Sequence, residues 1–300
     1  MTRSPKPLHT TPHTRRVATP RDDVERTLTL ILPLALALAL ALALAPTRPG
    51  HMNNPWRSLM SKGCAVVVGA GTGTGAEVAK RFAKGGYAVA LARRNAEALA
   101  PLVAEIEAAG GKAQAFGADA SDEATVAALF ENAERELGSI EVAVFNAAGF
   151  TMGSILDTTA EAFEEMWRAS ALGGFLVGRE AARRMVPRER GTLLFSGATA
   201  AMKASANFAA FASGKHGLRA VAQSMAKELG PKGIHVAHVI IDGVIDVPRV
   251  HETMPDFAAT KGKDGLIDPK SIAEAYLWLH EQPRNAWTFE LDLRPYKEPW

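Results

Sequence analysis

Cysteine is almost missing from this sequence, because Cys64 is the only one among 300 residues. No disulfide can therefore form within the chain, which fits a reducing compartment. The eight histidines are scattered, and no group of Cys and His has the spacing of metal ligands, so we expect no metal site. The net charge is only +2 and no run of Lys or Arg stands out, so we expect no nucleic-acid partner. What the chain does have is 47% apolar and 22% charged residues, the balance of an ordinary globular protein.

The first 50 residues differ in kind from the rest of the chain. Residues 1–26 are rich in Pro, Thr and Arg without periodicity, so we expect disorder there. An uncharged run of mainly Leu and Ala covers residues 28–45; it reaches the lower limit for a membrane-spanning helix and also resembles a signal peptide. Because Met52 and Met60 stand just ahead of the first folded segment, we expect an over-extended reading frame and a cytoplasmic protein. The alternative is membrane anchoring or export through residues 1–45, and a membrane is a partner only if this segment is retained.

Beyond residue 60, short apolar runs alternate with amphipathic segments. The apolar runs are typical of buried strands and cover residues 64–70, 87–92, 112–118, 141–147, 192–197 and 234–241. Apolar residues at helical spacing predict helices over residues 75–85, 95–109, 121–137, 160–186 and 205–229, and a late helix and short strand follow over 271–282 and 287–291. Strands separated by helices of this length imply parallel crossovers with helices on both faces of one sheet. The sequence therefore predicts an α/β fold with a single doubly wound parallel sheet, in one domain over residues 60–300.

A glycine-rich turn follows the first predicted strand. The stretch GAGTGTG covers residues 69–75 and leads straight into a predicted helix. Its glycines permit a tight turn and let the backbone approach a pyrophosphate, while the helix N-terminus supplies N–H groups and a positive dipole. The order of strand, turn, helix and second strand favours a dinucleotide site over a plain tight turn.

Two arginines occupy the position that separates the two nicotinamide dinucleotides. An acidic residue about 20 positions after the turn, at the end of the second strand, would bond the ribose 2′-hydroxyl of NADH. This chain has Arg93 and Arg94 there instead. Because a guanidinium fork matches a 2′-phosphate, we expect NADP(H) to be preferred over NAD(H).

Several segments make residues 62–295 resemble the short-chain dehydrogenase/reductase family. Val68 and the glycine-rich turn are similar to the family's TGxxxGxG segment, with Val68 in place of Thr. Residues 146–149, NAAG, resemble its NNAG segment, and residues 242–245, DGVI, fall where it has Pro-Gly-x-Ile. FASGK, residues 211–215, stands in the place of YxxxK. The resemblance implies an NAD(P)-binding Rossmann fold, a small-molecule substrate, and a homodimer or homotetramer.

The resemblance also implies which residues carry the chemistry, and most of them are replaced. Phe211 stands at the position of the proton-donating tyrosine, and Ala198 stands at that of the serine. None of the chain's three tyrosines, Tyr87, Tyr276 and Tyr296, belongs to the segments that build the family's catalytic face, although the tail could fold back. The candidate catalytic residues are Lys215 (the one that is kept), Ser196, Thr199 and Ser170, the last at the position of a helix asparagine.

The same resemblance assigns the residues that should hold the dinucleotide. Asp119 matches the acid beside the adenine ring, and Lys215 matches the lysine on the nicotinamide ribose. The full set of candidate cofactor-binding residues is Gly69, Gly71, Thr72, Gly73, Thr74, Gly75, Arg93, Arg94, Asp119, Ala120, Asn146, Ala147, Lys215 and Val244.

Two functions remain open at this point. The first is an NADPH-dependent reductase of a carbonyl or conjugated enoyl compound, with an altered route for the proton. The second is a catalytically silent NADP(H)-binding sensor or partner subunit, in which Lys215 only holds the ribose. Losing the tyrosine hydroxyl removes a group whose assistance typically contributes ~10²–10⁴-fold in rate, so turnover separates the two.

Overall fold

The computed structural model describes residues 61–298 of the chain. The predictions made for the first 50 residues, including the apolar run 28–45 and the starts at Met52 and Met60, lie outside the described residues. Between residues 61 and 298, no helix combines the length and the apolar character that crossing a membrane requires.

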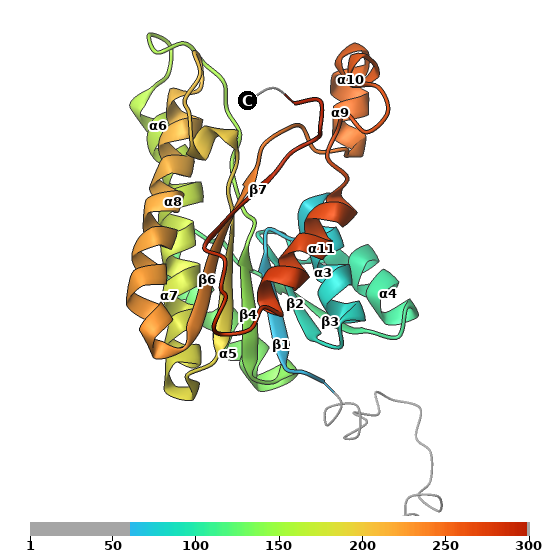
Figure 1. The fold of residues 1–300 in the computed structure, drawn as a ribbon, viewed down its shortest axis with the longest axis vertical. Helices are drawn as coiled ribbons and strands as arrows, with labels where there is room; N and C mark the ends of the chain where they lie inside the picture. The colour runs from blue at the N-terminus through green and yellow to red at the C-terminus, as the bar shows by residue number, and fades with distance from the viewer. Residues whose placement is uncertain (1–60, 299–300) are drawn as a thin grey trace, which may run out of the picture. The chain divides into compact units, whose positions relative to one another are not determined.

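Seven strands form one parallel sheet (Figure 1). They are β1 Cys64–Val68, β2 Ala88–Arg93, β3 Lys112–Gly117, β4 Ile140–Phe145, β5 Gly191–Ser196, β6 Ile234–Ile241 and β7 Glu290–Leu293. Their order across the sheet is β3-β2-β1-β4-β5-β6-β7, and every neighbouring pair is parallel. The order reverses between β1 and β4, and at such a switch point an open parallel sheet leaves a crevice beyond its carboxyl edge. The predicted doubly wound fold is therefore confirmed.

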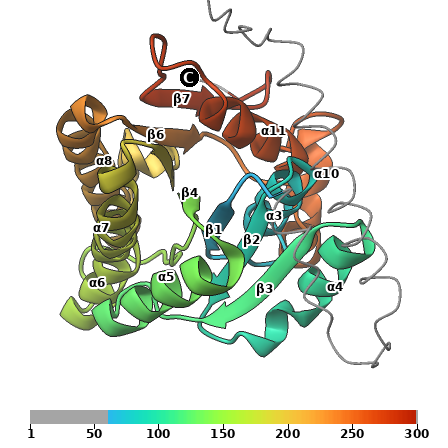
Figure 2. The ribbon, with the colours of Figure 1, turned by 90° about the horizontal axis from the view of Figure 1, so that it is seen from below.

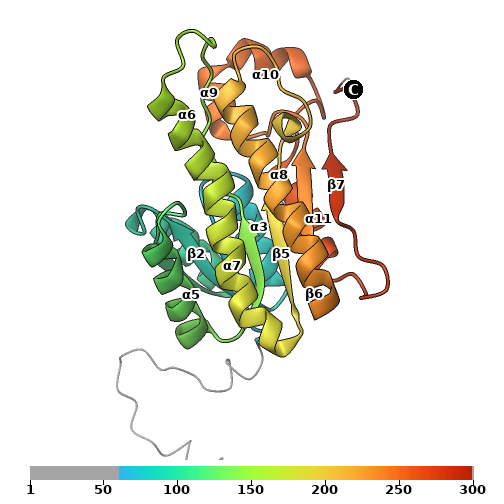
Figure 3. The same cartoon turned by 90° about the vertical axis from the view of Figure 1, so that its left-hand side faces the viewer.

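Helices cover both faces of the sheet, as the alternation along the sequence predicts. The larger ones are α3 Thr74–Lys84, α4 Ala100–Ala108, α5 Glu123–Leu137, α6 Ala160–Trp167, α7 Gly173–Met185, α8 Ala209–Leu229 and α11 Pro269–His280. Viewed from below, α5, α7 and α8 lie on one side of the sheet and α3, α4 and α11 on the other (Figure 2). Figure 3 shows α7 and α8 side by side across their face of the sheet. Two short helices, α9 Pro248–Thr253 and α10 Pro255–Lys261, follow β6.

Strand β1 shows how the sequence pattern produces two cores. Val66 and Val68 pack into the core under α5, α7 and α8, whereas Ala65 and Val67 point into the core under α3, α4 and α11. All four side chains are buried. A strand that is covered on both faces needs apolar residues at consecutive positions, which explains why the apolar runs of the sequence do not alternate with polar residues.

One predicted helix differs from the structure in a way that concerns the site. The expected helix over residues 160–186 is interrupted by a π-helical segment, Arg168–Leu172, between α6 and α7. A π segment widens the helix by one residue per turn, and such bulges occur frequently at functional sites. The periodicity of apolar residues does not reveal an extra residue in one turn, so the sequence predicts an unbroken helix.

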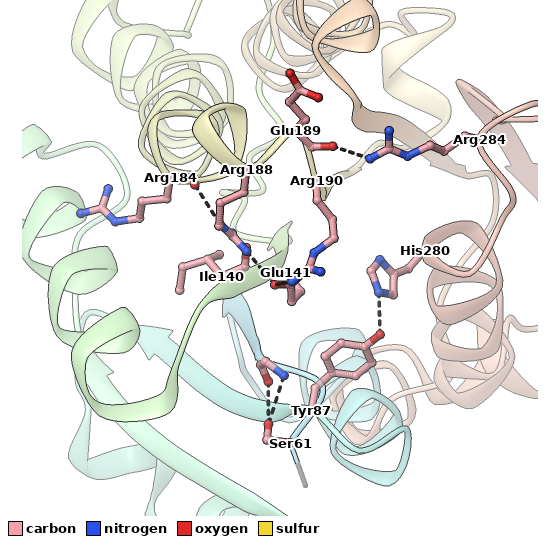
Figure 4. A network of polar contacts seen from close by, with 11 residues as sticks. Ser61, Tyr87, Ile140, Glu141, Arg184, Arg188, Glu189, Arg190, His280 and Arg284 are labelled. Carbon is pink, nitrogen blue, oxygen red and sulfur yellow. Dashed lines mark hydrogen bonds and ion pairs between the residues drawn. The ribbon is translucent and has the colours of Figure 1, made fainter. Parts of the chain in front are cut away.

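The amino edge of the sheet is held by a polar network (Figure 4). The buried carboxylate of Glu141 in β4 accepts hydrogen bonds from Arg188 at 2.6 Å and from Arg190 at 2.7 and 2.8 Å. Nearby, Tyr87 Oη lies 2.7 Å from His280 Nε2, which ties β2 to the end of α11. These contacts lie at the edge opposite to the crevice and leave the carboxyl ends of the strands for the site.

Candidate functional site

A cavity of about 860 Å³ opens at the switch point of the sheet. Its walls come from the segments that follow β1, β2, β3 and β4, together with one side of α6. Of the predicted cofactor-binding residues, it brings together Gly69, Gly71, Arg93, Arg94, Asp119, Ala120, Asn146 and Ala147. The others, Thr72, Gly73, Thr74, Gly75, Val244 and Lys215, lie outside its lining.

The glycine-rich turn is packed so closely that two of its positions admit no side chain. Gly69 has a φ of +88°, and a Cβ there would lie 2.4 Å from the backbone nitrogen of Ala147. A Cβ on Gly75 would lie 2.3 Å from the carbonyl oxygen of Gly69. At Gly71, by contrast, an added Cβ meets no atom within 4 Å, because this residue faces the open cavity. The turn thus presents bare backbone to whatever occupies the cavity.

The cavity contains both positive and negative groups near the ends of β2 and β3. Among residues 61–298, the guanidinium groups of Arg93 and Arg94 form no hydrogen bond, although both line the cavity. The carboxylate of Asp119 accepts hydrogen bonds from Ser121 N at 2.9 Å and from Ser121 Oγ at 2.8 Å. These two bonds, with smaller contributions from Arg94 and Arg168, lower the pKa of Asp119, so the carboxylate stays ionised.

Asn146 and Ser196 belong to a chain of buried hydrogen bonds across three strand ends. Asn146 Nδ2 donates to the carbonyl of Gly69 at 3.1 Å, and its Oδ1 accepts from Ser196 Oγ at 2.9 Å. Ser196 Oγ also lies 2.6 Å from the hydroxyl of Tyr276, which is fully buried in α11. Tyr276 does not belong to the segments expected to build the catalytic face, but its hydroxyl contacts Ser196 from α11. Sequence pattern could not reveal this contact, because it joins residues 80 positions apart.

Lys215 is buried, with 4% of its surface exposed, and its ammonium group faces the end of β5. Nζ donates a hydrogen bond to the carbonyl oxygen of Ser196 at 2.8 Å. Burial lowers the pKa of Lys215 to about 8. No carboxylate forms an ion pair with it within the part of the chain that the structure describes. One carbonyl satisfies only one of the three donors of the ammonium group, which leaves donors for a ligand.

Ser170 lies in the middle of the π-helical segment and is fully buried. Its Oγ has no hydrogen-bond partner in the described residues. Gly214, the neighbour of Lys215, packs against it, since a Cβ on Gly214 would lie 3.2 Å from Ser170 Oγ. The structure therefore places Ser170 beside the turn of α8 that carries Lys215.

Phe211 lies one helical turn before Lys215, in a cluster of three aromatic rings. Its ring centroid lies 5.4 Å from that of Phe150 and 6.4 Å from that of Phe208. Phe150 is 65% exposed and belongs to the segment after β4. A hydrogen bond from Gly153 N to Asn207 O at 2.9 Å connects this segment to the residues that precede α8. The position expected for a proton donor is thus occupied by an apolar, ring-lined surface.

Thr199, the remaining candidate, begins the short 3₁₀ helix η4, Thr199–Ala201, directly after β5. Its hydroxyl donates to Asp242 Oδ1 at 2.5 Å. Asp242 is buried and is also bound by Arg294 from the C-terminal tail. In the sequence, Asp242 is visible only as a departure from Pro-Gly-x-Ile. Its hydrogen bonds with Thr199 and Arg294 join distant segments, so no local pattern reveals them.

Helix α6 contributes a charged wall to the cavity that the sequence analysis also missed. Glu161, Glu164, Glu165 and Met166 of α6 line the cavity, and Arg168 of the following π-helical segment joins them. The sequence did show that α6 is the first helix after β4, but helical spacing alone does not tell which charged side faces a ligand. No group of three or more potential metal ligands occurs within residues 61–298.

Comparison with known proteins identifies the family and agrees with the fold. A family model described as short chain dehydrogenase matches residues 63–256. A short-chain dehydrogenase/reductase of Armillaria gallica is 37% identical over 175 residues, which are 57% of this chain and 67% of the relative. The crystal structure of a short-chain dehydrogenase from Rhodopseudomonas palustris is 45% identical, with a TM-score of 0.67, and the alignment covers 78% of this chain and 98% of that one.

Two further solved structures were determined with a bound dinucleotide. A metagenomic short-chain oxidoreductase in complex with NADP is 26% identical with a TM-score of 0.68, over 79% of this chain and 98% of its own. A 7α-hydroxysteroid dehydrogenase in complex with NADH and 7-oxo glycochenodeoxycholic acid is 27% identical with a TM-score of 0.72, over 82% and 98%. With the fold, the glycine-rich turn and the family model in agreement, the chain belongs to the short-chain dehydrogenase/reductase family, whose members are NAD(P)-dependent oxidoreductases.

Proposed function

We propose that the protein is an NADPH-dependent oxidoreductase that reduces a small carbonyl or conjugated enoyl compound. The observation that supports this most is the cavity that combines the bare glycine-rich turn with the two arginines after β2. Bound NADPH would supply the hydride, which is the chemistry of the cofactor itself. The protein's own residues bind and orient the dinucleotide and handle the proton.

The residues present fit a dinucleotide with a 2′-phosphate. Arg93 and Arg94 line the cavity without hydrogen bonds to other described residues, and a guanidinium pair with free donors matches a dianionic phosphate. Thr74, in the first turn of α3, has a buried Oγ1 without a partner in residues 61–298. A helix N-terminus with an unused hydroxyl fits the pyrophosphate. Ionised Asp119 fits the donor edge of adenine, and Lys215 fits the ribose hydroxyls.

The choice of dinucleotide depends on the arginines and can be tested at Arg94. Replacing Arg94 by Ala removes charge-assisted hydrogen bonds worth about 1.5–3 kcal/mol, so the Kd for NADPH should rise about 10–100-fold. The Kd for NADH should stay within a factor of about two, because NADH lacks the 2′-phosphate. Arg81→Ala is the matched control, since Arg81 lies on α3 with its guanidinium 2.7 Å from Glu274, outside the cavity. Equal losses for both dinucleotides would contradict the preference for NADP(H).

Turnover decides between the enzyme and the silent binding protein. The purified full chain is mixed with NADPH and, separately, with cyclohexanone, phenanthrenequinone and crotonyl-CoA, and loss of NADPH absorbance is followed. Oxidation above the rate without substrate for at least one compound supports the proposal. Tight NADPH binding without oxidation in any mixture would favour the alternative of a catalytically silent sensor or partner subunit. The observation that supports this alternative is Phe211 at the position of the proton donor.

We also propose that the protein forms a homodimer or homotetramer through α6, α7 and α8. Phe163, Trp167 and Phe175 expose 41%, 41% and 40% of their surfaces along the outer side of these helices. Large apolar side chains that stay exposed on neighbouring helices support a surface that binds another protein. Analytical ultracentrifugation should show an oligomer that Trp167→Glu dissociates, and a monomeric wild type would contradict the proposal.

A further inference from the structure

Asp242 is a buried carboxylate for which the resemblance to the family provides no role. It follows β6 directly and is 6% exposed. Its Oδ1 accepts the hydroxyl proton of Thr199, and its Oδ2 accepts a hydrogen bond from Arg294. A carboxylate removed from water is costly unless charges and donors compensate, so this arrangement is a specific one. Three separate segments supply it: the turn after β5, the end of β6 and the tail after β7.

The Thr199–Asp242 pair lies at the carboxyl edge of the sheet, where the cavity also opens. Thr199 comes three residues after Ser196, whose carbonyl holds Lys215 Nζ at 2.8 Å. The segment after Asp242 approaches the glycine-rich turn, because a Cβ on Gly73 would lie 3.0 Å from Val247 Cγ1. Figure 1 shows the tail after β7 and the helices that follow β6 at this same end of the molecule. Within the pair, Thr199 therefore follows the same strand end, β5, whose carbonyl holds Lys215.

The direction of the hydrogen bond between the two residues decides their chemistry. Thr199 donates its only proton to Asp242, so its oxygen offers lone pairs to a ligand and cannot donate to a carbonyl. Arg294 donates to the other carboxylate oxygen of Asp242 and also contacts Asp292 in β7 at 3.2 Å. An ionised carboxylate behind a threonine hydroxyl can accept a proton through that hydroxyl.

We propose that Thr199 and Asp242 are the proton route that replaces the missing tyrosine, with Thr199 in contact with the reacting oxygen of an alcohol/carbonyl pair. The inference rests on the proposed oxidoreductase function. When the alcohol is oxidised, the carbinol C–H bond breaks and its hydride passes to NADP⁺. The substrate O–H proton passes to Thr199 Oγ1 while the threonine proton passes to Asp242 Oδ1, and the C=O bond forms. Carbonyl reduction runs through the same transfers in reverse, starting from protonated Asp242.

This route selects among the substrates left open above. A secondary alcohol or its ketone needs a proton moved at oxygen during hydride transfer, which Thr199 and Asp242 supply. Alcohol oxidation needs Asp242 to accept a proton, and ketone reduction needs it to return one through the hydroxyl of Thr199.

Three variants test the route, with cyclohexanol and NADP⁺ or cyclohexanone and NADPH as probes. Asp242→Asn and Thr199→Val should each lower kcat by about 10²–10⁴-fold. Thr199→Ser, which keeps the hydroxyl, should restore activity. Asp292→Asn is the matched control, because Asp292 binds the same arginine but forms no hydrogen bond with Thr199 among the described residues, and it should retain full kcat.

The conservative variant separates a chemical role of the threonine hydroxyl from a purely structural one. If Thr199→Ser recovers no activity over Thr199→Val while both fold, the route is overturned. If Asp242→Asn fails to fold, as judged by circular dichroism, the kcat of Thr199→Val alone tests the route.

The outcomes distinguish the two proposals. If the wild type converts the probes and both variants keep its rate, the proton route is overturned while the oxidoreductase function stands. If the wild type converts phenanthrenequinone or crotonyl-CoA but neither cyclohexanol nor cyclohexanone, the alcohol/carbonyl assignment is overturned. If the wild type converts nothing, the proposed function fails, and the proton route fails with it.

Discussion

Lys215 and Phe211 are separated by one turn of α8, yet their surroundings differ. Lys215 is held by the backbone of β5 through the 2.8 Å hydrogen bond to Ser196 O, in a dry environment that lowers its pKa to about 8. Phe211 faces two other rings and the segment after β4. A lysine that keeps two unused donors still suits a ribose, whereas a phenyl ring has no proton to move. Binding and proton transfer are thus separated at the level of single residues.

Phe211→Tyr should create carbonyl reductase activity if the geometry around Lys215 is otherwise intact. A tyrosine hydroxyl one turn before Lys215 would provide a general acid, and such groups typically contribute ~10²–10⁴-fold in rate. The measurement is NADPH oxidation with cyclohexanone, compared with the wild type. Phe208→Tyr, in the same ring cluster but one turn farther from Lys215, is the control and should give no gain. An unchanged rate for Phe211→Tyr, at unchanged NADPH affinity, would show that more than the hydroxyl is missing.

At the scale of elements, the π-helical segment between α6 and α7 is built around a close contact with α8. Ser170 sits in the widened turn, and Gly214 of α8 lies against it. A Cβ on Gly214 would lie 2.9 Å from the carbonyl oxygen of Met166 and 3.0 Å from Ser170 Cβ. The glycine therefore allows the two helices to approach and positions the turn of α8 that carries Lys215.

Gly214→Ala should destabilise the protein, because the added methyl group forces these helices apart. Overpacking of this kind typically costs about 1–3 kcal/mol, which urea denaturation can measure. Gly230→Ala is the matched control in the same segment of sequence. At Gly230 an added Cβ meets no atom within 4 Å and the backbone is right-handed helical, with φ of −54°. That variant should be neutral or gain up to about 1 kcal/mol, and equal effects of the two substitutions would contradict the packing argument.

For the whole molecule, two histidines whose pKa is lowered by burial make stability depend on pH. His238 in β6 is fully buried, and burial lowers its pKa to about 4, although Glu290 at 3.2 Å acts in the opposite direction. Lys215 and Arg219 also oppose its protonation. His280 at the end of α11 has its pKa lowered to about 4 by burial as well. Both side chains are therefore neutral in the folded protein at neutral pH.

Stability should fall as the pH is lowered from about 6.5 to about 4. In this window the histidines of the unfolded chain bind protons that the folded chain excludes, so protonation favours unfolding. Above pH 6.5 both states are neutral and the stabilisation is fully present; below about pH 4 the folded state is protonated too, and the loss levels off. For His238 the loss is on the order of 3 kcal/mol.

Urea denaturation across this pH range checks the prediction, with His238→Gln as the comparison. The glutamine amide can still donate to Glu290 but does not titrate, so the variant should show a shallower dependence of the free energy of unfolding on pH. An identical slope in wild type and variant would exclude His238 as a source.

The sequence by itself determined the fold class, because consecutive apolar positions within the strands, alternating with segments of helical spacing, predict a parallel sheet covered on both faces. It also determined the glycine-rich turn and the arginines after β2, whose residue types reflect local backbone and charge requirements. The tertiary structure alone decided the contacts between distant segments: Tyr276 with Ser196, Thr199 with Asp242, and Asp242 with Arg294. These contacts depend on the order in which strands pair across the sheet, and a local sequence pattern does not predict that order.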